Sequence, residues 1–336
     1  MNYKLLGNSG LRVSEISLGT MTFGTEWGWG ADKEVSKQIF NAYANAGGNF
    51  LDTANRYTEG TSEKYVGEFI HSDRDHWVVA TKYSLYDKLE DPNFSGNHRK
   101  NMMRSVEQSL KRLDTDYIDL LWLHAWDFTT PVEEVMRGLD DLVSAGKVNY
   151  IGISDTPAWI IARANTIAQF RGWSQFVGLQ IEYSLIQRTP ERDLIPMAKE
   201  MGLALTPWAP LAGGALTGKY LKGEDGRVAE ESARRNDRSV QITKKVVEVA
   251  DQLGVSPAQV AMKWTMQKDY TSIPIVGGRK LHQIEDSLKS VELDLPENMI
   301  AELDEVSAIE LGFPHDFLQG DNVKQLLFGG TYDKLG

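Results

Sequence analysis

Four side chains that can hold or pass a proton lie at or just after the ends of short apolar runs in this sequence. Asp52, Lys82 and His124 each end such a run, and Tyr57 follows Asp52 by five residues. A tyrosine is a weak acid, with an ordinary pKa of about 10. A lysine ammonium beside it stabilises the phenolate and lowers that pKa. An aspartate paired with the lysine keeps the ammonium charged, and a histidine nearby can hydrogen-bond to a substrate oxygen. The four residue types predict a site that delivers a proton to a substrate.

Each of these residues taken alone has a simpler structural explanation. Strand-end aspartates cap helices, loop tyrosines pack against the surface, lysines extend to solvent, and histidines are often satisfied within a core. The four become a candidate site only together, because the carboxyl ends of successive parallel strands meet on one rim of a barrel.

Eight apolar runs are candidate strands of one parallel sheet. They are short and rich in Val, Ile and Leu, as expected of strands that are buried on both faces. The runs are residues 15–19, 49–52, 77–82, 117–124, 148–154, 176–181, 204–208 and 272–276.

Helical patterns separate these runs. Residues 33–46 follow a candidate N-cap at Asp32, and residues 101–113 carry apolar side chains at helical spacing. Further helices are predicted to begin near Thr61, Pro131, Pro157, Pro190 and Ser256. Eight strand–helix pairs with short connections predict an α/β fold, a closed (β/α)8 TIM barrel, in which residues 1–336 form a single domain. A doubly wound open sheet is the alternative, although no Gly-x-Gly-x-x-Gly follows the first run.

Three additions to the barrel are expected. Residues 4–13 read as an N-terminal β-hairpin that closes the bottom of the barrel, and a C-terminal helix and tail follow the last strand. Residues 221–239 are long and polar, which fits either a lid over a ligand or a mobile surface loop. The basic residues of this loop are Lys222, Arg227, Arg234, Arg235 and Arg238.

Composition narrows the range of functions. The 336 residues are 41% hydrophobic and 25% charged, which is typical of a globular protein with a large core. The sequence contains no cysteine, so disulfides and cysteine-ligated metal sites are excluded, and we expect no metal. A net charge of −11 argues against nucleic acid or an anionic membrane as a partner. Because no apolar stretch reaches the length of a membrane span or a signal peptide, we expect a cytoplasmic protein.

Further blocks of residues follow in order along nearly the whole chain. They are residues 18–21, 23–24, 49–54, 60–63, 80–82, 116–120, 146–148, 151–154, 183–185, 207–211, 213–214, 216–220 and 277–279, with Gln180 and Pro274. Together with Tyr57 and His124, these blocks resemble the aldo-keto reductase family. Within it, the chain is similar to a branch that includes aryl-alcohol dehydrogenase-like reductases and potassium-channel β subunits, and we expect a bacterial member. The resemblance implies an NADP(H)-dependent oxidoreductase that reduces an aldehyde or ketone to an alcohol by hydride transfer.

The resemblance also implies a role for each catalytic residue. Tyr57 would be the general acid, Lys82 and Asp52 would tune it, and His124 would orient the substrate. The residues implied to bind NADPH or NADP+ are Thr20, Met21, Asp52, Ser154, Asp155, Gln180, Trp208, Ala209, Pro210, Leu211, Gly213, Lys219, Gly277, Arg279, Gln283, Asp286 and Ser287.

Several of these cofactor positions have distinct implied tasks. Ser154, Asp155 and Gln180 match positions that hold the nicotinamide carboxamide, and Trp208 matches the aromatic residue that stacks on the nicotinamide ring. Arg279 favours NADP(H) over NAD(H), because a guanidinium binds a phosphate with two parallel hydrogen bonds. Asp155 departs from the family's usual Asn or Arg, and an aspartate cannot donate to the carboxamide oxygen. Ser287 likewise replaces an Asn that usually contacts adenine.

Aromatic residues are expected to wall the substrate side of the rim. The predicted pocket residues are Phe23, Trp27, Tyr86 and Trp126, with Trp29, Phe128, Phe313, Phe317 and Phe328 on the same side. Such walls suit aryl aldehydes, flat ketones and sugar faces alike, so the sequence predicts a small-molecule carbonyl substrate without identifying it. The sequence is compatible with a homo-oligomer but does not specify the oligomeric state.

Two other classes of function are compatible with parts of this sequence. An NADP(H)-binding regulatory subunit with little turnover fits the same fold, but potassium-channel β subunits commonly carry Asn at the position of His124. A barrel glycosidase would need paired carboxylates, for which Asp52, Asp119 and Glu182 are the candidates, and would leave Tyr57 and Lys82 without a role.

Overall fold

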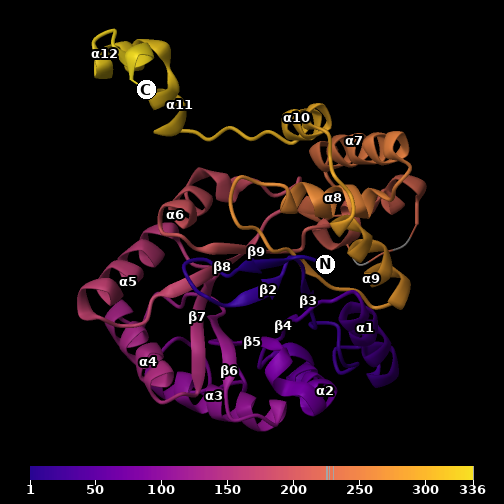
Figure 1. Cartoon of the computed structure of the whole chain (residues 1–336), viewed down its shortest axis with the longest axis vertical. Coiled ribbons are helices and arrows are strands. Elements are labelled where there is room, and N and C mark those ends of the chain that lie inside the picture. Colours follow the sequence, from indigo (N-terminus) through magenta and orange to yellow (C-terminus); the bar gives the residue numbers. More distant parts are fainter. Residues whose placement is uncertain (225, 227, 230, 336) are drawn as a thin grey trace.

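Eight parallel strands form the centre of the molecule (Figure 1). The computed structural model describes residues 1–224, 226, 228–229 and 231–335. The strands are paired in the order β10-β3-β4-β5-β6-β7-β8-β9, and a parallel bridge between Leu205 and Ser272 joins the two ends of the sheet. The predicted (β/α)8 TIM barrel is confirmed. Its strands are β3 (Ser17–Gly19), β4 (Phe50–Asp52), β5 (Val78–Tyr83), β6 (Ile118–Leu123), β7 (Val148–Ser154), β8 (Phe176–Glu182), β9 (Ala204–Trp208) and β10 (Ile275–Val276).

Helices surround this barrel and begin where local sequence signals predict. The Asp32 carboxylate accepts a hydrogen bond from Val35 N at 2.9 Å at the start of α1, and Ser256 caps α8 in the same way. The main helices are α1 (Lys33–Asn45), α2 (Thr61–Ile70), α3 (Arg99–Leu113), α4 (Val132–Ser144), α5 (Ala158–Arg171), α6 (Leu194–Glu200), α7 (Asp237–Leu253), α8 (Pro257–Met266), α9 (Leu281–Leu288) and α10 (Glu297–Val306). Short 3-10 helices lie between them: η1 (Tyr57–Gly60), η2 (His71–His76), η3 (Thr189–Arg192), η4 (Ala212–Thr217), η5 (Lys219–Lys222), η6 (Ala233–Arg235) and η7 (Lys289–Val291).

The predicted N-terminal hairpin closes the amino-terminal end of the barrel (Figure 1). Strands β1 (Tyr3–Leu5) and β2 (Arg12–Ser14) pair antiparallel, and the buried side chains of Leu6 and Val13 pack with apolar residues from the strands inside the barrel. Gly7 lets the turn approach closely: its φ is +57°, and a Cβ there would lie 2.1 Å from the carbonyl oxygen of Val177. The hairpin thus seals one end and leaves the carboxyl ends of the strands as the open rim.

The interior of the barrel is filled by side chains and forms no channel. Trp122 on β6 is fully buried, and its ring occupies space beside Gly152 and Gly178 on the next two strands. A Cβ on Gly152 would lie 2.2 Å from that ring. Chemistry is therefore confined to the rim.

The long polar segment at residues 221–239 contains helical structure in the part that the structure describes. Helix η6 and the first residues of α7 occupy its second half, and Arg238 donates to the carbonyl oxygens of Ile186 and Ser307 at 2.8 and 2.6 Å. Arg234 pairs with Glu182 at the end of β8. Arg227 lies outside the described residues. The segment is thus attached to the rim beside β8.

The C-terminal tail stands away from the barrel (Figure 1). Residues of α10 are tied to α7 by the Lys245–Glu302 ion pair at 3.2 Å, and Arg192 holds the carbonyl oxygen of Glu310. Beyond this point an extended segment leads to α11 (His315–Gln319), α12 (Asp321–Phe328) and η8 (Tyr332–Lys334). The predicted C-terminal helix and tail are confirmed, but the tail does not return to the rim.

Candidate active site

Lys82 lies at the centre of the predicted proton-transfer site. Its side chain is completely buried, and its Nζ lies 2.6 Å from Asp52 Oδ2, 2.8 Å from the Thr53 carbonyl oxygen and 3.0 Å from Tyr57 Oη. An ammonium has three N–H donors, so all of them are used. The structure brings Lys82, Asp52 and Tyr57 together as the strand ends predicted.

Burial and charge act in opposite directions on this group. Burial is the largest influence on Tyr57 and raises its pKa, while the charge of Lys82 lowers it, and the net shift is upward. The predicted effect of Lys82, which lowers the pKa of Tyr57, is present, but desolvation of the phenolate outweighs it. Lys82 itself has a raised pKa: burial lowers it, but Asp52 and Tyr57 more than compensate. At neutral pH, Tyr57 keeps its proton and Lys82 its charge.

Asp52 connects this group to β8. Its Oδ1 accepts a hydrogen bond from Gln180 Nε2 at 2.9 Å, while its Oδ2 binds Lys82. Both oxygens of the carboxylate are thereby fixed, which holds the lysine in one position below the tyrosine hydroxyl.

His124 faces Tyr57 across the rim. The two ring centres are 6.0 Å apart at an interplanar angle of 83°. Burial, with a smaller effect of the Lys82 charge, lowers the pKa of His124 to about 3, so the imidazole is neutral at physiological pH. Among the described residues neither ring nitrogen has a hydrogen-bond partner, and Nδ1 is buried. A neutral imidazole with a free N–H can donate to a substrate oxygen, but it cannot serve as a cationic acid.

An unusual backbone segment fixes the position of Tyr57, and sequence reasoning did not anticipate it. Thr58 and Glu59 have φ angles of 45° and 54°, in the left-handed region that non-glycine residues rarely adopt. The Thr58 hydroxyl donates to the carbonyl oxygen of Phe23 at 2.5 Å and accepts from Ser62 N, which secures the turn. The only sequence signal for this turn is Gly60, whose φ is +88°.

The candidate carboxamide-binding residues differ in whether their side chains already make hydrogen bonds within the protein. The Ser154 hydroxyl is buried and has no partner among the described residues. Asp155, by contrast, accepts a hydrogen bond from Trp208 Nε1 at 3.2 Å, and Gln180 donates to Asp52. Burial raises the pKa of Asp155, although the Trp208 hydrogen bond opposes this. Ser154 is therefore the one of the three whose side chain makes no hydrogen bond to the described residues.

The predicted cofactor residues after β9 lie in a sharply turned segment. Ala209, Ala212, Gly213 and Gly214 have positive φ angles, so the chain turns sharply just above Trp208. Arg234 bridges this region, because it pairs with Glu182 and its guanidinium lies 5.9 Å from the Trp208 ring centre. The other predicted residues in this stretch are Pro210, Leu211 and Lys219, the last near Gly214.

The predicted cofactor residues Gly277, Arg279, Gln283, Asp286 and Ser287 lie just before and within α9. Arg279 is exposed, and its backbone N–H is capped by Gln283 Oε1 at 3.0 Å. Asp286 is already engaged, because its two oxygens accept from the Ser256 hydroxyl at 2.7 Å and Gln259 Nε2 at 2.6 Å. Ser287 is buried. Arg279 is therefore the exposed cationic side chain of this set, and a Cβ on Gly277 would lie 3.3 Å from the carbonyl oxygen of Gly19.

The two predicted cofactor residues that follow β3 also lie at the rim. The Thr20 hydroxyl donates to the Asp52 carbonyl oxygen at 3.1 Å and lies 2.8 Å from the Ser62 hydroxyl, while Met21 is half-buried. Thr20 thus positions the Asp52 backbone, with its side chain turned away from solvent.

One of the predicted aromatic wall residues, Trp27, lies beside Tyr57. The Trp27 ring is 6.5 Å from the Tyr57 ring, edge to face, and 5.6 Å from Trp29. Tyr86 is joined to this wall through Arg56, whose Nη2 donates to Tyr86 Oη at 2.8 Å. Trp126 is half-buried near the Asp155 backbone, and Phe128 points to solvent.

Other predicted wall residues are not in the pocket. Phe23 is fully buried and packs against Phe69 in the apolar core, because its side chain turns outward toward α2. Phe313 and Phe317 are mostly exposed on the tail, and Phe328 packs against Tyr332 within it. The prediction that these four residues lie on the substrate side of the rim is therefore wrong.

The carboxylates required by a glycosidase are not paired. Asp119 lies near the amino-terminal end of β6, where it binds Arg74 at 2.7 Å and Val79 N at 3.0 Å. Asp52 is at the opposite end of its strand and is bound to Lys82, while Glu182 is paired with Arg234. This arrangement does not provide the two facing carboxyl groups that glycoside hydrolysis uses.

Two further features were looked for by their geometry in the described part of the chain, a cluster of metal ligands and a membrane-spanning helix. Within residues 1–224, 226, 228–229 and 231–335, no group of three or more His, Asp or Glu side chains is arranged to hold a metal ion. Among the helices in the same ranges, none is long and apolar enough to cross a membrane.

Comparison with known proteins defines the class of this barrel. Residues 15–308 match the model of the aldo/keto reductase family, and the chain belongs to that family. A norsolorinic acid reductase of Aspergillus flavus is 37% identical over 94% of this chain and 83% of its own length. An aryl-alcohol dehydrogenase [NADP(+)] of Phanerodontia chrysosporium is 38% identical over 98% of this chain and 92% of its own. A putative aryl-alcohol dehydrogenase of Saccharomyces cerevisiae is 34% identical. These relatives are fungal and do not support the expected bacterial source.

Proposed function

We propose that this protein is an NADP(H)-dependent oxidoreductase that reduces an aldehyde or ketone to an alcohol, with Tyr57 as the general acid. The observation that carries the proposal is the contact of Lys82 Nζ with Tyr57 Oη at 3.0 Å, on a lysine whose charge is held by buried Asp52. Residues 1–336 would work as one domain on a small carbonyl compound.

The residues present fit a nicotinamide cofactor. The buried and unpartnered Ser154 hydroxyl offers a hydrogen bond to the carboxamide, and the half-buried Trp208 offers a ring face next to it. Arg279 would meet the 2′-phosphate at the start of α9, which supports NADP(H) over NAD(H). When bound, the nicotinamide supplies the hydride that the carbonyl carbon accepts.

The protein's own residues then handle the proton. Tyr57 Oη donates its proton to the carbonyl oxygen, and the phenolate that remains faces the Lys82 ammonium. Because the site is buried, this charge interaction is stronger than it would be in water. Neutral His124 donates a hydrogen bond to the same oxygen and orients the carbonyl.

A Tyr57→Phe variant tests this assignment. We expect NADPH-dependent reduction across a panel of aryl aldehydes, ketones and sugars to fall by about 10²–10⁴-fold, the usual contribution of general acid catalysis. Tyr65→Phe is the matched control, because Tyr65 lies on α2 with no hydrogen bond to its hydroxyl among the described residues. Full reduction by Tyr57→Phe would refute the assignment.

The cofactor preference has its own test. Arg279→Ala should raise the KM for NADPH and leave that for NADH nearly unchanged, because only NADPH carries the 2′-phosphate. Equal effects on the two cofactors would remove Arg279 as the source of the preference.

A regulatory NADP(H)-binding subunit remains the alternative class. The free N–H of His124 beside Tyr57 favours the enzyme, because it has a role only when a substrate oxygen is present. Negligible turnover on the whole panel, together with tight NADPH binding, would favour the subunit.

A further inference from the structure

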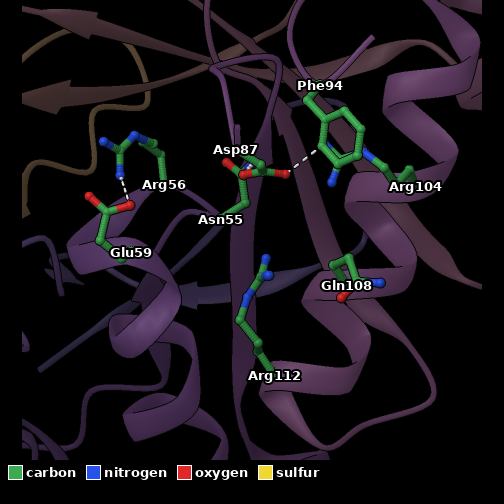
Figure 2. Close-up of a pocket in the computed structure, with 8 residues that line it drawn as sticks. All are labelled: Asn55, Arg56, Glu59, Asp87, Phe94, Arg104, Gln108 and Arg112. Atoms are coloured by element: carbon green, nitrogen blue, oxygen red, sulfur yellow. Dashed lines mark hydrogen bonds and ion pairs between the residues drawn. The ribbon is translucent and has the colours of Figure 1, made fainter. Parts of the chain in front are cut away.

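A cavity of about 400 Å³ lies outside the barrel, between η1 and α3 (Figure 2). It is separate from the tyrosine–lysine group, although its wall includes Asn55 and Arg56, which immediately precede Tyr57. Its size falls within the range of small-molecule sites, roughly 300–1,000 Å³. The proposed carbonyl reduction does not involve this cavity.

Three guanidinium groups face the cavity. Arg56, Arg104 and Arg112 line it together with the carboxylates of Asp87 and Glu59. The side chains of all three arginines are largely buried. Each of them is paired with one carboxylate, Arg56 with Glu59, Arg104 with Asp87 and Arg112 with Glu63, so the wall concentrates N–H donors in a partly desolvated setting without an excess of charge.

Buried polar atoms in this wall lack partners. Asn55 is 2% exposed, and its Oδ1 accepts no hydrogen bond from the described residues, although its Nδ2 donates to Asp87 at 2.8 Å. Arg104 Nε is likewise buried and unpartnered. Arg112 uses its Nε for Glu63 at 2.5 Å, and Figure 2 shows its guanidinium directed toward Asn55. Such atoms are rare in proteins unless a ligand or water completes them.

We propose that this cavity binds a small organic oxyanion, a carboxylate or phosphate monoester that also carries a hydroxyl group. The anionic oxygens accept from the arginine N–H groups, which suit planar and bidentate recognition. The hydroxyl group donates to Asn55 Oδ1. This ligand matches both kinds of unused atom in the wall.

The cavity is linked to the candidate substrate wall through Arg56. Its guanidinium pairs with Glu59 at 2.5 Å and lies 4.4 Å from the Tyr86 ring centre. Glu59 in turn accepts a hydrogen bond from Trp27 Nε1 at 3.2 Å. An oxyanion that competes with Glu59 for Arg56 would loosen Trp27, which packs against Tyr57. Occupancy of the cavity should therefore change the KM for the carbonyl substrate more than the kcat, a consequence that rests on the proposed function.

A single substitution can block the cavity without removing a contact. Gln108 on α3 lines it and has no hydrogen bond among the described residues. Gln108→Glu introduces a carboxylate of the same size, which pairs with the arginines and repels an anion. Gln169→Glu makes the same change of charge on the exposed face of α5 and is the matched control.

Calorimetric titration with glycerate, glycerol 3-phosphate and neutral glycerol tests the site. It is run with and without saturating NADP+, so that binding at the cofactor's own phosphate site is recognised. We expect one glycerate or glycerol 3-phosphate per chain in both conditions, no binding of glycerol, and binding weakened by about tenfold or more in Gln108→Glu but not in Gln169→Glu. The preferred anion distinguishes a carboxylate ligand from a phosphate ligand. Absence of binding, or equal binding by Gln108→Glu, would overturn the site.

The link to catalysis is tested separately by activity. The bound anion should change the KM for an aryl aldehyde in the wild type and in Gln169→Glu, and leave it unchanged in Gln108→Glu. Binding without any change in KM would refute the link through Arg56 while leaving the site intact. If the protein shows no reductase activity, the titration still decides the existence of the site.

Discussion

The Lys82–Asp52 pair allows stability and catalysis to be separated by mutation. Replacing Lys82 with methionine keeps the volume of the side chain but removes the three hydrogen bonds of Nζ. It also leaves the Asp52 carboxylate, which is 3% exposed, without its counter-charge. Breaking one side of a buried ion pair costs about 3–5 kcal/mol, so Lys82→Met should lose that amount of unfolding free energy.

A second substitution restores the charge balance. In the double variant Lys82→Met with Asp52→Asn neither position of the pair carries a charge, and the amide oxygen at position 52 can still accept from Gln180 Nε2. We expect the double variant to be more stable than the sum of the single changes by about 1–3 kcal/mol, the coupling typical of contacting residues. Its reductase activity should stay as low as that of Lys82→Met, because no cation faces the Tyr57 phenolate.

Denaturant titration and steady-state NADPH oxidation measure the two quantities on the same preparations. In the double variant, the free energy of unfolding should recover and the reductase activity should not. Recovery of activity together with stability would show that Lys82 acts only by keeping the site folded. Unchanged stability of Lys82→Met would refute the account of the buried pair.

Three further predictions concern His124, Ser154 and the hairpin. The folded pKa of His124, about 3, is below its unfolded value of about 6.5, so the unfolded chain binds the extra proton and stability is lost as pH falls from about 6.5 toward 3. His124→Asn should show a smaller loss over that window in thermal melts, and an equal loss would contradict the assignment. Ser154→Ala should weaken NADPH binding by about 5–10-fold, one hydrogen bond, with unchanged melting temperature because the hydroxyl has no protein partner among the described residues; titration of protein fluorescence measures this, and unaltered affinity would exclude the contact. Leu6→Ala should cost about 2–5 kcal/mol in denaturant unfolding, because Leu6 is fully buried against the barrel interior, whereas a loss below 1 kcal/mol would mean that the hairpin is not part of the core.

The sequence was sufficient to predict the barrel and the group of proton-carrying side chains on its rim. Buried parallel strands read as apolar runs, and the residue that follows such a run must lie on the rim, so Asp52, Lys82 and His124 could be placed without coordinates. Tyr57 could be placed near them by its distance along the chain, although the left-handed turn at Thr58 and Glu59 that fixes it has no sequence signature beyond Gly60.

The features that the sequence did not predict depend on the direction of side chains and on the balance between burial and charge. Phe23 follows a strand, yet its ring turns into the core, and a periodic pattern does not determine that choice for a loop residue. The aromatic residues of the tail were expected on the rim, but an extended segment after Glu310 leads them away. The pKa of Tyr57 required the depth of burial, which the residue types alone do not provide.

The most direct test of the central claim is the rate of a single turnover by Tyr57→Phe with NADPH already bound. The claim is that Tyr57, held at 3.0 Å by Lys82, donates the proton to the carbonyl oxygen. It predicts unchanged NADPH affinity, because no cofactor contact is removed, and a hydride-transfer rate about 10²–10⁴-fold below that of the wild type and of Tyr65→Phe. A Tyr57→Phe variant that binds NADPH and transfers hydride at the wild-type rate would contradict the claim.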